Sequence, residues 1–171
     1  MKLSRLAATA ALVVLAGWAG VSWYTSPQRQ IGRQLRRIQR LVSKAPGEDN
    51  LTALAKARSA IELFASRFEF EAAPFDFHTR DRQRLISAIQ QYRSRAEAIL
   101  VQFPEREVSV EEEQRRATSL VTAQLITRAR DLSGREAYRL QINWLLEDGR
   151  WRIDYVRLLE ILEDPPRSWI P

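Results

Sequence analysis

Residues 138–158, YRLQINWLLEDGRWRIDYVRL, consist of two runs of alternating apolar and polar residues, separated by Asp148 and Gly149. An Asp-Gly pair between two such runs is typical of a two-residue hairpin turn, because both central residues of that turn take positive φ. The turn fixes the register of the two strands. The expected pairs are Leu146 with Trp151, Leu145 with Arg152, Trp144 with Ile153, Asn143 with Asp154, Ile142 with Tyr155 and Arg139 with Leu158.

One face of this hairpin is apolar over its whole length. It carries Tyr138, Leu140, Ile142, Trp144, Leu146, Trp151, Ile153 and Tyr155. A bare face of that size would aggregate, so we expect helices to cover it. The other face is mostly polar, and there the alternation places Asp154.

Further strands are expected beyond Ile99, where the period of the apolar residues changes from helical to alternating. We expect them at residues 100–110 (interrupted by Pro104), 119–130, 135–146 and 151–159. A shorter strand and a turn, broken by Pro74, are expected within residues 68–78.

Three helices are expected before these strands. The first spans residues 27–45. The second starts at Leu51 after a cap at Asp49 or Asn50 and ends near Ser66, with a face that includes Ala65 and Phe68. The third is capped by Thr79 or Asp81, and its outward residues are Arg82, Arg84, Arg93 and Arg95. The sequence therefore predicts an α+β fold in which three N-terminal helices pack on one face of an antiparallel sheet.

The order of these elements, the aromatic segment Phe68 to Phe77 and the terminal hairpin resemble the nuclear-transport-factor-2-like superfamily, also called the cystatin-like fold. The resemblance covers roughly residues 50–163. It implies that a curved sheet and the helices form a cone with an apolar pocket, which superfamily members use as ketosteroid-isomerase-like or polyketide-cyclase-like enzymes and as non-catalytic binding modules. The enzymes place an Asp, Tyr or His in the cone, so the resemblance implies a pocket without naming a reaction.

Candidate site residues follow from the expected inward faces. The aromatic side chains expected to line the cone and bind a ligand are Phe64, Phe68, Tyr92, Tyr138, Trp144, Trp151 and Tyr155. Asp76 and His78 are the candidates for proton transfer, although residues before a helix more commonly act as caps or loop residues. One histidine and no cysteine leave few metal ligands, and there is no calcium loop and no glycine-rich phosphate loop. We expect neither a metal nor a cofactor.

The first 26 residues form a segment of their own. After Lys2 and Arg5, residues 6–24 carry no charge and match the length of a helix that crosses a bilayer. Trp18, Trp23 and Tyr24 gather at its far end, as in a retained anchor, whereas the small residues within it allow a cleaved signal peptide. We expect a single membrane-spanning or signal helix ahead of the globular part.

The positive charge of the chain is concentrated in residues 1–44. They hold eight of the 27 basic residues and none of the 21 acidic ones, so the remaining residues carry a formal charge of −2. This distribution is a poor match for a nucleic-acid-binding domain. The basic amphipathic helix at 27–45 either lies on anionic lipid or packs on its own domain with its arginines in water. The arginines expected at the membrane are Arg29, Arg33, Arg36, Arg37 and Arg40, together with the aromatic residues above.

These features predict a chain with a helix at 1–26, a basic helix at 27–45 and one cystatin-like domain at 46–171. We expect a single-pass inner-membrane protein whose domain is exported to the periplasmic side, although the arginines beyond the span argue for the cytoplasm. The favoured function is a non-catalytic module that binds a partner protein or an apolar ligand. The alternative is a ketosteroid-isomerase-like or cyclase-like enzyme acting on a lipid-like substrate. A homodimer through the sheet is a further expectation.

Overall fold

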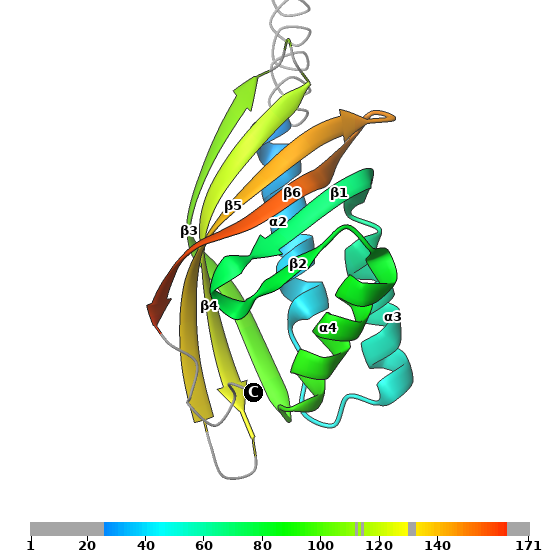
Figure 1. Cartoon of the computed structure of the whole chain (residues 1–171), viewed down its shortest axis with the longest axis vertical. Coiled ribbons are helices and arrows are strands. Elements are labelled where there is room, and N and C mark those ends of the chain that lie inside the picture. Colours follow the sequence, from blue (N-terminus) through cyan, green and yellow to red (C-terminus); the bar gives the residue numbers. More distant parts are fainter. Residues whose placement is uncertain (1–25, 112, 114, 130–132, 164–171) are drawn as a thin grey trace, which may run out of the picture.

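The computed structural model describes residues 26–163, apart from 112, 114 and 130–132. The helices of this part are α2 (Pro27–Val42), α3 (Asn50–Ile61), α4 (Arg82–Ser94) and the short 3-10 helix η1 (Ala73–Phe75). The strands are β1 (Phe64–Ala72), β2 (Phe77–Thr79), β3 (Ala98–Glu111), β4 (Arg116–Arg128), β5 (Ser133–Glu147) and β6 (Arg150–Glu163). Helices α2, α3 and α4 lie on the concave side of the curved sheet (Figure 1).

The β5–β6 hairpin has the predicted turn. Asp148 and Gly149 take φ values of 50° and 73°, as a two-residue turn of this kind requires. The strands end and begin on either side of them, at Glu147 and Arg150. The pairs predicted next to the turn are observed: Leu146 with Trp151, Leu145 with Arg152 and Trp144 with Ile153.

A β-bulge in β6 shifts the register beyond these pairs, so the more distant predictions are wrong. Asp154 has no partner in the register, and Tyr155 rather than Asp154 pairs with Asn143. Ile142 consequently pairs with Val156, which is buried on the core side. The extra residue turns Tyr155 away from the apolar face where it was expected. Arg139 likewise pairs with Glu160 instead of Leu158.

The sheet is mixed rather than purely antiparallel. Its strand order is β2-β1-β6-β5-β4-β3, and β1 pairs with β6 in parallel while the other neighbours are antiparallel. Parallel neighbours need a long connection, and here the connection contains α4 and the strands β2 to β5. The prediction of an antiparallel sheet is therefore wrong at the one pair that no hairpin joins.

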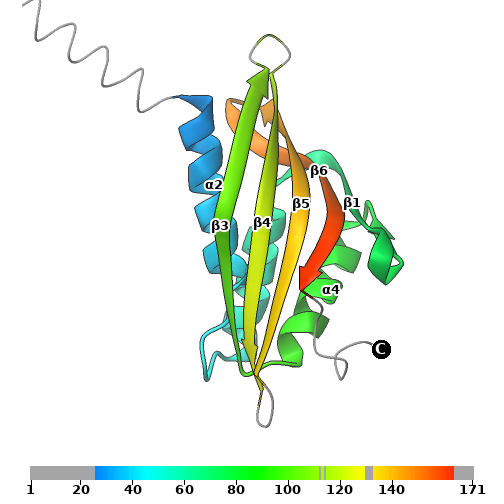
Figure 2. The same ribbon diagram turned by 90° about the vertical axis from the view of Figure 1, so that its left-hand side faces the viewer.

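Helix α2 is part of the core. Ile31 and Leu35 are completely buried and belong to the same cluster as Trp144 and Trp151 of the hairpin. Fully burying each aliphatic side chain contributes about 1.5–3 kcal/mol. The helix runs beside β3 (Figure 2). The apolar face of this basic helix therefore packs on its own domain, which was one of the two interpretations of its sequence. Most of its arginines are exposed to solvent: Arg33, Arg36, Arg37 and Arg40.

Helix α3 ends earlier than predicted. Asp49 caps it, as expected, by accepting a hydrogen bond from the Thr52 backbone N–H at 2.9 Å. The helix stops at Ile61, however, so Ala65 and Phe68 lie on β1 and not on a helix face. The parallel pairing with β6 accounts for the difference, since it offers β1 a strand edge that the local sequence pattern does not reveal.

Arg93 was predicted to face outward from the third helix, but its side chain is 2 % exposed. The guanidinium donates to the carbonyls of Leu41, Val42 and Ser43 at 3.1, 2.5 and 3.2 Å, and it pairs with the buried carboxylate of Glu48. These carbonyls lie at the C-terminal end of α2, where the helix itself offers them no N–H donor. Arg93 therefore joins the end of α2 to α4.

Within the described residues, no helix is both long and apolar enough to cross a membrane. The apolar stretch of residues 6–24, including Trp18, Trp23 and Tyr24, lies outside those residues. The membrane anchor and the signal peptide both stay predictions.

Candidate functional site

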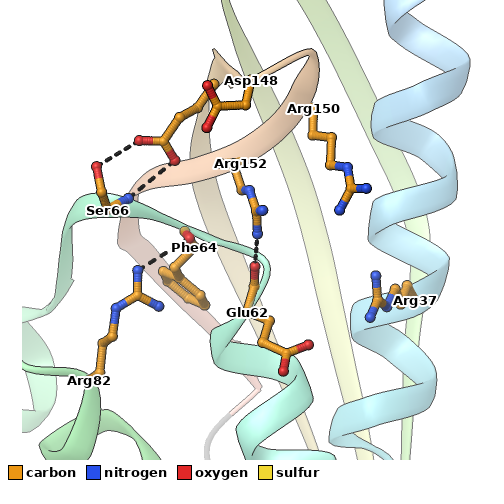
Figure 3. Close-up of a pocket in the computed structure, with 9 residues that line it drawn as sticks. Arg37, Glu62, Phe64, Ser66, Arg82, Asp148, Arg150 and Arg152 are labelled. Carbon is orange, nitrogen blue, oxygen red and sulfur yellow. Dashed lines mark hydrogen bonds between the residues drawn. The ribbon is translucent and has the colours of Figure 1, made fainter.

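An open pocket of about 550 Å³ lies between α2, the start of β1 and the β5–β6 turn (Figure 3). We call it the rim pocket. Its volume falls within the range of ordinary ligand sites. The residues that line it are Arg37, Glu62, Phe64, Ser66, Arg82, Glu147, Asp148, Arg150 and Arg152. Seven of these nine side chains are charged, so the pocket is suited to a charged ligand.

Three of the charged side chains are held by hydrogen bonds to the backbone or to a hydroxyl. Arg82 donates to the carbonyls of Ile61 and Ala65 at 2.9 and 2.6 Å. Arg152 donates to the Glu62 carbonyl. Glu147 accepts hydrogen bonds from the Ser66 hydroxyl, at 2.6 Å, and from its N–H, at 3.3 Å. The pocket wall is therefore fixed by hydrogen bonds and not by ion pairs between its own charged side chains.

The Ser66 hydroxyl is the main cause of a lowered pKa at Glu147, and the charges of Arg152 and Arg82 add to the effect. This carboxylate accordingly stays ionised at neutral pH.

The other four charged side chains of the rim pocket have no partner among the described residues. They are Arg37, Arg150, Glu62 and Asp148. In Figure 3 the guanidinium groups of Arg37 and Arg150 lie on the α2 side of the opening, with Glu62 below them and Asp148 above. Charges that share a pocket without pairing are available to a ligand.

A second polar cluster lies inside the cone. Glu136 of β5 is 1 % exposed, and its carboxylate accepts hydrogen bonds from the hydroxyls of Tyr92, at 3.1 Å, and Tyr138, at 2.6 Å. Burial, followed by the nearby negative charge of Glu136, raises the pKa of Tyr92. The Tyr138 ring also contacts Phe75 edge to face, with ring centroids 6.0 Å apart. The structure thus brings two of the predicted binding residues together on one buried carboxylate.

Sequence reasoning missed Glu136, although a signal for it was present. Glu136 lies two residues before Tyr138, so the alternation that places Tyr138 inward places Glu136 on the same face. The strand was predicted to begin at residue 135, but the predicted inward face began only at Tyr138 and so left out Glu136.

The two proton-transfer candidates lie away from both sites. Asp76 is an exposed residue with a φ of 49° at the end of η1. The His78 side chain is 53 % exposed, and its Nε2 lies 2.7 Å from the carboxylate of Glu69. Hydrogen bonds from Arg80 and then from His78 lower the pKa of Glu69. Neither Asp76 nor His78 lines the rim pocket or touches Glu136.

The remaining binding candidates divide between core and surface. Trp144 and Trp151 are 1 % and 4 % exposed and pack on α2, and the Trp144 indole N–H donates to the Ser119 hydroxyl at 2.8 Å. Phe68 is buried, with its ring edge to face on Phe64, which lines the rim pocket. The hydroxyl of Tyr155, which the bulge turns away from the core, donates to Glu71 at 2.5 Å.

No metal site is evident in the part of the chain that the structure describes. No three His, Cys, Asp or Glu side chains gather there as ligands. Because arginine side chains carry only donors, the rim pocket also lacks the coordinating groups of a metal centre on its cationic side.

Comparison with known proteins supports the fold. No family model matches the chain, and no curated protein matches it. Solved structures do. An NTF2-like protein with a cystatin-like fold from Novosphingobium aromaticivorans is 14 % identical, with a TM-score of 0.63 over 99 % of this chain and 97 % of its own. A candidate scytalone dehydratase from the same organism is 14 % identical, with a TM-score of 0.65 over 82 % and 89 %.

A third structure, a protein of unknown function with a cystatin-like fold from Nostoc punctiforme, is 11 % identical, with a TM-score of 0.60 over 78 % of this chain and 90 % of its own. The chain therefore has a cystatin-like fold, as its hairpin and element order predicted. At these identities the likeness concerns the fold alone, and the activity of any of these proteins does not transfer.

Proposed function

We propose that the chain is a membrane-tethered, non-catalytic binding module of the NTF2-like fold, and that its ligand binds in the rim pocket. The observation that carries the proposal is the rim pocket itself, an open cavity whose charged side chains form no ion pair with one another. Four of them, Arg37, Glu62, Asp148 and Arg150, are exposed and have no ion-pair partner among the described residues, so an ionic ligand could contact them without displacing an existing ion pair. We therefore propose that recognition takes place at the edge of the cone and not in an apolar interior.

Binding without catalysis fits the chemistry of the lining. General acid–base catalysis needs a group that exchanges a proton near the working pH. Arginine stays charged throughout that range, and the lowered pKa of Glu147 keeps its carboxylate ionised. His78, whose side chain could exchange protons near neutrality, lies on the β2 strand outside the pocket.

The alternative function, an isomerase-like or cyclase-like enzyme, has one observation in its favour. Glu136 is a buried carboxylate on the inward face of the sheet, where an enzyme of this fold would hold a base. Both of its oxygens, however, already accept hydrogen bonds from Tyr92 and Tyr138. A carboxylate that already accepts hydrogen bonds from two tyrosine hydroxyls of its own chain is better suited to holding the structure together than to accepting a proton from a substrate. We therefore favour binding.

The tether rests on the sequence. The uncharged stretch of residues 6–24 has the length of a membrane-spanning helix, and aromatic residues collect at one end of it. We propose that it holds the module at the inner membrane with the domain on the periplasmic side. Helix α2 follows this stretch almost directly, beginning at Pro27.

Cell fractionation tests this proposal. Full-length protein is expressed, membranes are washed with alkaline carbonate, and intact spheroplasts are treated with protease. We expect full-length protein in the washed membrane pellet. In the spheroplasts, we expect the added protease to digest the domain. A matched variant, Leu12→Arg with Val14→Arg, should leave the pellet because each charge at a span centre costs about 2.5–3.5 kcal/mol. Soluble protein shortened by roughly 2 kDa, the size of a signal segment, would overturn the tether.

A further inference from the structure

We propose that the rim pocket binds a phosphate ester that also carries hydroxyl or ammonium groups, either as a free small molecule or as the headgroup of a phospholipid. The inference rests on the proposed binding function and adds the chemical class of the ligand. It follows from the position of four guanidinium groups and three carboxylates around one cavity.

The cationic side of the pocket favours phosphate over carboxylate. Arg37 comes from α2, whereas Arg150 and Arg152 come from β6, so the guanidinium groups approach the cavity from separate elements (Figure 3). A carboxylate has two oxygens in one plane, which a single arginine fork satisfies. A phosphate offers oxygens in several directions and can engage forks that arrive from different sides.

Two of these arginines are free to bind, and the chain that carries them is fixed. Arg37 and Arg150 have no partner among the described residues. Arg37 lies two residues after Leu35, which is completely buried and holds this part of α2 on the core. Arg150 directly follows the Asp148–Gly149 turn, and its neighbour Trp151 is 4 % exposed. Binding a ligand would therefore order the two arginine side chains but would not need to order the backbone that carries them, which lowers the entropic cost of binding.

The acidic side of the pocket indicates what accompanies the phosphate. Glu62 and Asp148 have no ion-pair partner among the described residues, and as carboxylates they accept hydrogen bonds. A ligand that is only an anion would be repelled by them. Hydroxyl or ammonium groups next to the phosphate would instead donate to them, as in a glycerol phosphate or an ethanolamine phosphate.

Calorimetric titration of the full chain in a mild non-ionic detergent tests the inference. The probes are glycerol 1-phosphate, inorganic sulfate, glycerol, and dihexanoylphosphatidylglycerol below its micelle concentration. We expect saturable binding of glycerol phosphate, with sulfate at least tenfold weaker and no binding of glycerol. If the short-chain lipid binds as well, the natural ligand is a lipid headgroup. If only glycerol phosphate binds, the natural ligand is a free ester. Each of these results supports the proposed chemistry.

Variants locate the site. Arg37→Gln and Arg150→Gln each remove one charge-assisted contact and should weaken glycerol phosphate at least tenfold. Arg58→Gln is the matched control, because Arg58 is exposed on α3 outside the pocket, and it should leave the affinity unchanged. Thermal unfolding of all three should match the parent protein, since the two pocket arginines are exposed and make no side-chain hydrogen bond or ion pair with the described residues.

Two outcomes would overturn the inference: no saturable binding of glycerol phosphate or the lipid, or binding that the double variant Arg37→Gln/Arg150→Gln leaves intact. Sulfate binding as tight as that of the ester would refute the role given to Glu62 and Asp148. These results are independent of cell fractionation. A chain that stays in the membrane pellet but fails the titration keeps the tether and loses the ligand, and a soluble chain that passes it keeps the ligand.

Discussion

Replacing Arg93 with methionine should destabilise the domain strongly, because Arg93 is the buried link between α2 and α4. The substitution removes hydrogen bonds to the carbonyls of Leu41, Val42 and Ser43 and the ion pair to Glu48, whose side chain is only 2 % exposed. Removing one partner of a buried ion pair costs about 3–5 kcal/mol.

Two details place the expected cost at the lower end of that range. Lys56 still pairs with Glu48 at 2.5 Å in the variant, so the carboxylate keeps one cation. The Arg93 Nε atom is buried without a partner, and its removal relieves a small penalty. We therefore expect a loss of about 3 kcal/mol, which for a chain of this size lowers Tm by about 10 °C.

The assay is thermal unfolding of the full chain in a mild detergent, followed by circular dichroism at pH 7. Arg58→Met is the control, because it changes an exposed arginine on a neighbouring helix to the same residue, and we expect its Tm to stay within about 2 °C of the parent. Arg93→Lys should fall between the two, since a lysine cannot reach the carbonyls and Glu48 together. A Tm for Arg93→Met equal to that of the control would refute the reasoning.

Three further predictions concern single sites. Gly149→Ala should destabilise the hairpin by about 1–2 kcal/mol, measured by urea unfolding, because the added Cβ meets open space but sits at a φ of +73°; no change would mean that the turn adapts. Tyr92→Phe removes one donor to buried Glu136 and should cost about 1.5–3 kcal/mol in the same assay; a cost below 0.5 kcal/mol would show the carboxylate satisfied without it. Burial, opposed by Arg116, raises the pKa of Asp154, and its Oδ1 has no partner. Its ionisation therefore weakens the fold as pH rises through that pKa; Asp154→Asn should stabilise the protein at pH 7 and lose this advantage by pH 3, and a pH-independent difference would contradict the assignment.

Acid should weaken the helix junction for the opposite reason. Burial raises the pKa of Glu48, but the hydrogen bonds and charges of Lys56 and Arg93 outweigh it and leave the pKa below its usual 4.5. A lowered pKa stabilises the fold above about pH 4.5, and this contribution disappears as the pH falls through the folded value. The difference in urea midpoint between the parent and Arg93→Met should therefore be smaller at pH 3 than at pH 7. An equal difference at both pH values would show that the ion pair with Glu48 is not what Arg93 contributes.

Local signals in the sequence predicted the parts of the fold that neighbouring residues determine. The Asp148–Gly149 turn, the Asp49 and Asp81 caps and the apolar face of α2 are each specified within a few residues, and all are observed. The bulge at Asp154 also left a local trace, since Val156 and Leu158 are apolar out of phase with Trp151 and Ile153.

The errors arose where distant segments meet. The early end of α3 and the parallel β1–β6 pair depend on strands more than 80 residues apart, as in Phe64 with Ile153. The burial of Arg93 depends on carbonyls contributed by the end of α2. The rim pocket likewise gathers Arg37, Arg82 and Arg150 from three elements, and no spacing along the chain could have linked them.

The most direct test of the account is to map where glycerol 1-phosphate binds by NMR of the isotope-labelled full chain in detergent micelles, following backbone amides and arginine Nε–H groups. We predict that the signals of Arg37, Gly149 and Arg150 shift with one saturating dependence on concentration, while those around Glu136 stay in place. Shifts gathered at Tyr92, Glu136 and Tyr138 would contradict the account, because they would move the binding site from the rim into the cone and revive the enzyme alternative.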